Sequence, residues 1–109
     1  MVLDVVIDSK SLTLDITDPF RADIDALVSQ IEDFGKTNQK EVSSLDLKGL
    51  IPAMIRGVKG CERGCPADAK GIVARGYTGF SLQYVEGGIL TAQAALGSSS
   101  LQLKMFPDF

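Results

Sequence analysis

The chain has 109 residues, of which 45% are hydrophobic and 23% are charged, and its formal net charge is −3. This length supports one hydrophobic core, and the composition is typical of a folded protein and not of a disordered one. The acidic balance argues against nucleic acid as the main partner. We therefore expect a single domain over residues 1–109 that binds no nucleic acid.

Residue types that are missing or scarce limit the chemistry further. The chain has no histidine, which removes the usual general base and the commonest metal ligand. Its two cysteines are too few for a disulfide-stapled secreted scaffold. No apolar run approaches the roughly 20 residues of a membrane-spanning helix, and Met1–Asp4 lacks the pattern of a signal peptide. These observations predict a cytoplasmic protein with no membrane contact.

The N-terminal residues predict a β-hairpin. Residues 2–7 are mostly apolar, and residues 12–16 alternate between apolar and polar side chains. The residues between them, Asp-Ser-Lys-Ser, are typical of a turn. Both segments are therefore expected to pair as strands.

A helix is predicted over residues 19–34. Asp18 can cap it, and Pro19 fits its first position because that position needs no backbone N–H. One apolar stripe at helical spacing comprises Phe20, Ile24, Leu27, Val28 and Ile31. Gly35 is placed to adopt the left-handed conformation that ends a helix.

A second helix is predicted from the next apolar stripe, after an ambiguous segment at residues 42–47 that suits either a short strand or an irregular approach. The stripe comprises Leu47, Leu50, Ile51, Met54, Ile55 and Val58. Pro52 would break a helix interior, so we expect this helix to begin near Lys48 or Gly49, with the proline in its first turn.

The rest of the chain predicts a third, shorter helix from Pro66 to Gly76 and then three strands. The strands are expected at residues 80–84, 89–96 and 101–105. The whole order predicts an α+β fold. Its antiparallel sheet combines the N-terminal hairpin with a C-terminal three-stranded meander, and about three helices pack on one face.

Both cysteines lie in one loop between the second and third predicted helices. Cys61 and Cys65 have the spacing C-x3-C. Residues 34–75 carry eight basic side chains against four acidic ones, whereas residues 1–33 carry eight acidic side chains against two basic ones. The cysteine loop therefore belongs to the basic part of an acidic protein.

One interpretation of this loop is a redox-active thiol pair. Cys65 lies near the start of the third predicted helix, and Lys59 and Arg63 are close in sequence, so a thiolate is favoured there. The spacing exceeds that of the C-x-x-C redox motif by one residue. The pair can close a disulfide only where Gly60 and Gly64 let the backbone turn.

Another interpretation is a metal site. Cys61 and Cys65 supply half of the tetrahedral set that zinc or an iron–sulfur cluster takes. The missing ligands would come from Glu62, from Asp68, or from the same loop of a second subunit. This alternative therefore takes the form of a thiolate site shared across a dimer.

A third interpretation is an anion site that does not use the sulfur atoms. Backbone N–H groups at Gly60 and Gly64 and the third helix start could meet an anion. Arg56, Lys59 and Arg63 add positive charge. The loop lacks the phosphate-loop pattern G-x-x-x-x-G-K-[ST], so nucleotide hydrolysis is not predicted.

The structural alternative is a tight turn whose cysteines are small buried side chains. We predict a binding or assembly domain, not an enzyme. Its binding surface is expected to be loop 59–66, and no cofactor is expected to be required. It is expected to meet a protein partner or to self-associate through the loop or a sheet edge. The alternative is a thiol-redox or metal-thiolate protein that uses Cys61 and Cys65. The terminal Phe106–Phe109 segment is expected to dock on the protein's own core.

Overall fold

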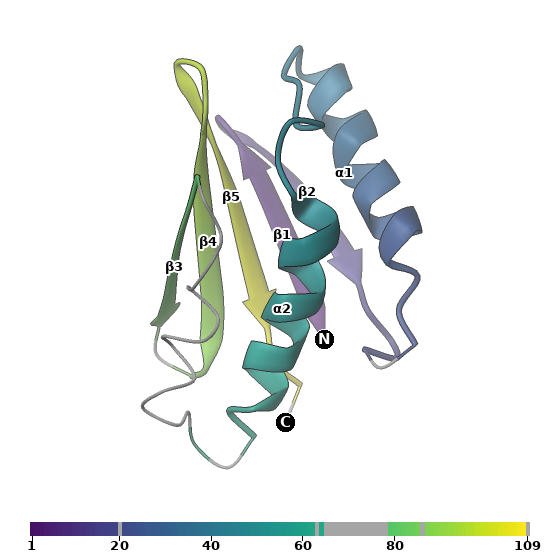
Figure 1. The fold of residues 1–109 in the computed structure, drawn as a ribbon, viewed down its shortest axis with the longest axis vertical. Coiled ribbons are helices and arrows are strands. Elements are labelled where there is room, and N and C mark those ends of the chain that lie inside the picture. Colours follow the sequence, from purple (N-terminus) through teal and green to yellow (C-terminus); the bar gives the residue numbers. More distant parts are fainter. Residues whose placement is uncertain (20, 63, 65–78, 86, 109) are drawn as a thin grey trace.

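The structure is a computed structural model that describes residues 1–19, 21–62, 64, 79–85 and 87–108 (Figure 1). Its elements are β1 (Val2–Ile7), β2 (Lys10–Asp15), α1 (Ile24–Thr37), α2 (Leu47–Lys59), β3 (Phe80–Val85), β4 (Ile89–Leu96) and β5 (Ser99–Phe106). The strands form one five-stranded sheet in the order β2-β1-β5-β4-β3, and every neighbouring pair is antiparallel. The predicted α+β class and antiparallel sheet are confirmed.

The first and last strands of the chain lie side by side at the centre of the sheet. β1 pairs with β5 from Val2 opposite Phe106 to Ile7 opposite Leu101. This pairing joins the N-terminal hairpin to the C-terminal meander. It also fixes which side chains share a face, because directly opposite residues in an antiparallel pair point to the same side.

One face of the sheet is buried under the helices, and we call the other the open face. α2 lies against β4 and β5, and α1 lies against β2 (Figure 1). The largest fully buried side chains come from both layers: Leu3, Val5, Ile7, Ile31, Leu47, Leu50, Ile51, Met54, Leu90, Leu101, Leu103 and Met105. Burial of these apolar side chains between sheet and helices supplies the main driving force for folding. The two described helices thus pack on one face, as predicted.

The predicted bounds of α1 are wrong at its start. The helix begins at Ile24, and Asp23 is its N-cap, whose carboxylate accepts a hydrogen bond from the Ala26 N–H at 3.1 Å. Asp18 instead begins a turn in which its carbonyl accepts from the Arg21 N–H at 3.1 Å. Both aspartates are good capping residues, and sequence alone did not separate them.

The predicted end of α1 is also wrong, because Gly35 lies inside the helix. A Cβ atom at Gly35 would lie 2.8 Å from the carbonyl oxygen of Lys40. The glycine therefore permits a close approach of the following main chain, not a left-handed turn. The helix ends with C-cap Asn38, and Gln39 takes the left-handed conformation with φ 60°.

The segment before α2 is not a strand, and α2 begins earlier than predicted. Asp46 caps the helix, and its carboxylate accepts from the Gly49 N–H at 3.1 Å. Because the helix begins at Leu47, Pro52 lies beyond its first turn, contrary to the prediction. The proline has no N–H to donate to the carbonyl of Lys48. Extensive burial of the α2 stripe outweighs that loss.

The prediction of about three helices is not confirmed, since the described residues hold two. The third predicted helix falls within residues 65–78, outside the described part of the chain. Among the described residues, no helix has the length and hydropathy needed to cross a membrane.

Candidate functional site

The candidate site lies along the C-terminal half of α2. Pro52, Ile55, Arg56 and Lys59 follow one another at helical spacing, so they share one side of the helix. They line a cavity of about 480 Å³, which we call the α2 cavity. This volume is within the roughly 300–1,000 Å³ of small-molecule sites.

The opposite wall of the α2 cavity comes from the segment that leads into α1. Pro19, Ala22 and Ile24 line it there. Sequence reasoning placed these residues in the first turns of a helix, and so it missed this wall. The ability of Asp23 to cap a helix was the signal that could have placed the helix start after Asp23, with Pro19 and Ala22 in the segment before it.

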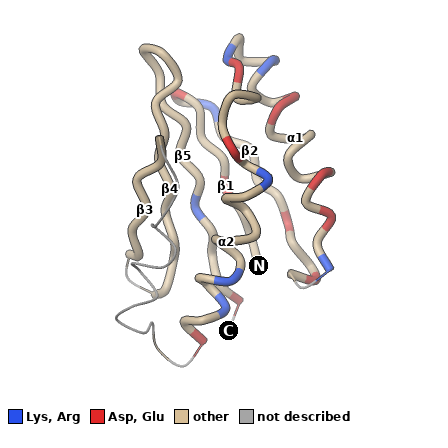
Figure 2. Tube along the Cα trace, viewed as in Figure 1, with Lys and Arg blue, Asp and Glu red and all other residues tan. Residues whose placement is uncertain are grey.

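Two positive charges lie at this otherwise largely apolar cavity. Arg56 and Lys59 lie in the last turn of α2, and Figure 2 shows this end of the helix as basic. Arg56 is exposed and makes no ion pair within the described part of the chain. Lys59 has 23% of its side chain exposed, and its Nζ lies 3.7 Å from Oε1 of Glu62. Among the described residues that line the cavity, the charged ones are Arg56 and Lys59, and both are basic.

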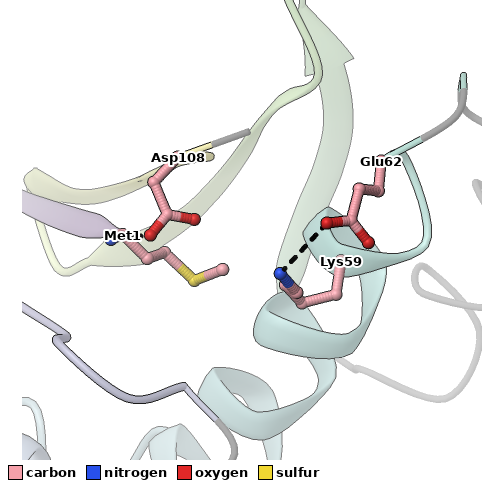
Figure 3. A network of polar contacts seen from close by, with 4 residues as sticks. All are labelled: Met1, Lys59, Glu62 and Asp108. Carbon is pink, nitrogen blue, oxygen red and sulfur yellow. Dashed lines mark hydrogen bonds and ion pairs between the residues drawn. The ribbon is translucent and has the colours of Figure 1, made fainter.

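A second polar contact, near Lys59, joins the two ends of the chain (Figure 3). The Met1 ammonium donates a hydrogen bond to Oδ2 of Asp108 at 3.0 Å. This hydrogen bond and the charge of the ammonium lower the pKa of Asp108, with a smaller contribution from the charge of Lys59. Asp108 is therefore held as a carboxylate that pairs with the Met1 ammonium.

Cys61 lies in the turn that follows α2. It is 4% exposed, and its sulfur atom is in a disulfide. Cys65, which is the one other cysteine of the sequence, lies outside the described residues. A sulfur atom in a disulfide is not a thiolate and so cannot bind a metal ion in this state. Among the described residues, no three Cys, His, Asp or Glu side chains come together as a metal site.

The backbone groups predicted to meet an anion are used inside the turn. The Gly60 N–H donates to the Arg56 carbonyl at 2.9 Å, and the Gly64 N–H donates to the Cys61 carbonyl at 3.0 Å. Gly64 has φ 98°, which requires a glycine, whereas Gly60 has an ordinary helical φ of −65°. Of the five predicted anion-binding residues, Arg56 and Lys59 therefore meet at one cavity. Arg63 lies outside the described residues.

Tyr84 at the end of β3 holds the last turns of α2 against the sheet. Its hydroxyl donates a hydrogen bond to the Gly57 carbonyl at 2.8 Å. Burial raises the pKa of Tyr84, which keeps the phenol protonated as a donor. The contact holds the helix segment that carries Arg56 and Lys59, and no local sequence pattern indicates it.

Comparisons of the chain with protein-family models, with curated proteins and with solved structures gave no match.

Proposed function

We propose that this chain is a binding domain without catalytic activity, and that it binds a small amphipathic anion in the α2 cavity. The observation that carries the proposal is the position of Arg56 and Lys59 at an apolar cavity of about 480 Å³. Ligand sites commonly combine apolar walls with a few polar groups that fix the orientation of the ligand. In this arrangement the cations pair with the anionic head, and Ile24, Pro52 and Ile55 contact its apolar body.

Charge supports an anion over a neutral or cationic ligand. Arg56 offers a planar guanidinium, whose paired N–H groups match the geometry of a carboxylate or phosphate. Lys59 adds a second cation, which Glu62 neutralises in part. The same two residues lie in the last turn of α2, where cations also stabilise the helix dipole. A test must therefore separate ligand binding from helix stability.

The test uses sodium octanoate as the probe, with 1-octanol and octylamine as its neutral and cationic counterparts. Isothermal titration calorimetry is expected to give a dissociation constant of about 0.1–1 mM for octanoate, since about 0.5 kcal/mol per non-hydrogen atom is ordinary for small ligands. The two counterparts are expected to bind at least about tenfold more weakly. Equal binding of all three probes would contradict the proposed anion site.

Variants assign the binding to the cavity. Arg56→Gln and Lys59→Gln are each expected to weaken octanoate binding about tenfold, because each removes a charge-assisted contact. Lys36→Gln is the matched control, since Lys36 is also a cation in the last turn of a helix but does not line the cavity. Weakening by Lys36→Gln to the same degree would assign the effect to net charge and overturn the proposal.

A second candidate function is thiol–disulfide exchange, and the observation that favours it is the disulfide at Cys61. Equilibration with glutathione buffers, read by intact mass, measures the reduction potential of this bond. A value above about −230 mV would support exchange, whereas a value below about −300 mV is typical of structural disulfides.

Serine substitutions separate the two functions. The variant with Cys61→Ser and Cys65→Ser is expected to bind octanoate within about twofold of the native chain, because Cys61 does not line the α2 cavity and the proposed contacts come from Arg56 and Lys59. Loss of binding in a variant that retains the native circular dichroism spectrum would tie the two functions together and contradict the independent binding site.

A further inference from the structure

The two edges of the sheet differ in how they are protected against pairing. An edge strand presents unpaired backbone N–H and C=O groups, which form a template for another strand unless charges or coverage prevent it. β2 is one edge and β3 is the other among the described strands. Any tendency to extend the sheet should follow from the residues of these two strands.

β2 carries the features that block pairing. Its sequence is KSLTLD, with a charged residue at each end. Lys10 shares its side of the strand with Leu12 and Leu14, which face the helices. An inward-pointing lysine on an edge strand is a known protection, because pairing would bury its charge against apolar side chains.

β3 carries none of these features. Its sequence is FSLQYV, which contains no charged residue and no proline (Figure 2). Phe80, Leu82 and Tyr84 pack against the core but stay half-buried, since the strand has one described neighbour. Val85 at its end is an exposed large hydrophobic residue, with 37% of its surface accessible. A second strand beside β3 would cover the flanks of Phe80, Leu82 and Tyr84.

The sequence of β3 is self-complementary when it is paired antiparallel about Leu82. In that register Leu82 lies opposite its own copy, Phe80 lies opposite Tyr84, and Ser81 lies opposite Gln83. Apolar residues then meet apolar residues on the side of the helices, and polar residues meet polar residues on the open face. Aromatic cross-strand pairs are among the favourable ones, so two Phe80–Tyr84 pairs favour this register.

We propose that β3 pairs with β3 of a second copy of this chain, antiparallel and about a two-fold axis at Leu82. The two five-stranded sheets then form one continuous sheet, with the helices of both copies on the same side. Pairing of five residues, Phe80–Tyr84, with the same residues of the copy gives an interface at the small end of the known range. The dimer is therefore reversible, with a dissociation constant in the micromolar range.

The first measurement is sedimentation velocity of the native chain from about 1 µM to about 500 µM, which spans that range. The expected result is a shift from monomer to dimer with rising concentration. A native chain that stays monomeric over the whole range overturns the proposal.

Charge variants on the open face test the strand and the register without touching the core. Ser81→Lys with Gln83→Lys places lysines opposite lysines at two symmetric positions, and it is expected to weaken the dimer at least about tenfold. Ser11→Lys with Thr13→Lys is the matched control, because it puts the same charges on exposed positions of β2. A dimer that persists in the β3 variant, or that is lost in the β2 variant, overturns the proposal.

A third variant distinguishes the proposed register from its neighbour. Ser81→Glu with Gln83→Lys places each glutamate opposite a lysine in the register about Leu82, so this dimer is expected to be as tight as the native one or tighter. In the register about Gln83 the two lysines would instead lie opposite each other, and their repulsion would weaken the dimer.

Circular dichroism of every variant shows whether the fold is kept. Octanoate binding is read separately, because the α2 cavity does not include β3.

Discussion

Gly35 lies where the end of α1 meets the main chain at Lys40. The Lys40 N–H donates a hydrogen bond to the Gly35 carbonyl at 2.8 Å, and a Cβ atom on Gly35 would lie 2.8 Å from the Lys40 carbonyl. The Cγ1 atom of Val42 would lie 3.3 Å from the same Cβ atom. This glycine is therefore required by a contact between segments, although helix propensity alone would favour alanine.

Substitution of this glycine provides the residue-scale prediction. Gly35→Ala is expected to lower the free energy of unfolding by about 1–3 kcal/mol, because the backbone oxygen cannot move away without shifting the turn. Gly60→Ala is the matched comparison. Gly60 has a helical φ, and the nearest atom to its added Cβ is at an ordinary 3.4 Å, so its effect is expected to lie within about 1 kcal/mol of zero or to stabilise. Urea denaturation measures the free energy of unfolding of both variants. Equal losses in the two variants would contradict the explanation that the close approach of Lys40 requires a glycine at position 35.

At the scale of elements, the entry into α1 decides the shape of the α2 cavity. Because the helix begins after Asp23 and not after Asp18, residues Pro19 and Ala22 remain in a connecting segment that faces α2. A helix from residue 19 would have placed these side chains differently. The N-cap at Asp23 is thus a structural requirement of the candidate site as well as of the helix.

The prediction at the scale of elements concerns the N-cap residue of α1, Asp23. Asp23→Ala is expected to lower the free energy of unfolding by about 1 kcal/mol, since the Ala26 N–H loses its side-chain acceptor. Asp23→Asn is expected to cost much less, because asparagine also caps well. Thermal or urea unfolding of the two variants checks this order. An alanine variant as stable as the asparagine variant would show that another residue caps the helix.

At the scale of the whole molecule, the ends of the chain meet in the central pair of strands and in the contact between Met1 and Asp108. The fold therefore depends on pairing between residues that are far apart in sequence, such as Val2 and Phe106. The ion pair adds an acid-sensitive contact beside that pairing. Because the ammonium lowers the pKa of Asp108, the folded state binds a proton there less readily than the unfolded state.

The lowered pKa of Asp108 in the folded state predicts how the stability of the protein changes with pH. The contribution of Asp108 is present above the ordinary aspartate pKa of about 4 and is lost as the pH falls through the lowered value. Asp108→Asn is therefore expected to be less stable than the native chain at neutral pH, with a difference that disappears in acid. Urea midpoints between neutral pH and about pH 2 measure it. Asp15→Asn, at an exposed carboxylate with no ion pair among the described residues, is expected to show no such convergence.

Much of the secondary structure was predictable because its signals are local. The apolar alternation of residues 12–16 and the stripe from Leu47 to Val58 each lie within one short window, and a strand and a helix appear there in the structure. Helix ends were predicted less well. Asp18 and Asp23 can both cap a helix, so the sequence does not separate them. A glycine such as Gly35 is expected both at a helix end and where the main chain passes close to a helix, so its presence does not tell the two apart.

The candidate site was predictable only in part. Charge and position singled out Arg56 and Lys59 from the sequence, and the structure brings both to the α2 cavity. The hydrogen bonds that occupy the Gly60 and Gly64 N–H groups could not be anticipated, because they depend on how the turn after α2 closes.

The sequence by itself determined the α+β class, the antiparallel strands and the apolar stripe of α2, because side-chain periodicity is encoded over neighbouring residues. Only the tertiary structure decided that β1 pairs with β5, that the Tyr84 hydroxyl donates to the Gly57 carbonyl, and that Pro19, Ala22 and Ile24 line a cavity with α2. These contacts join distant parts of the chain. Their choice depends on burying the apolar faces of all elements together, which no single stretch of sequence specifies.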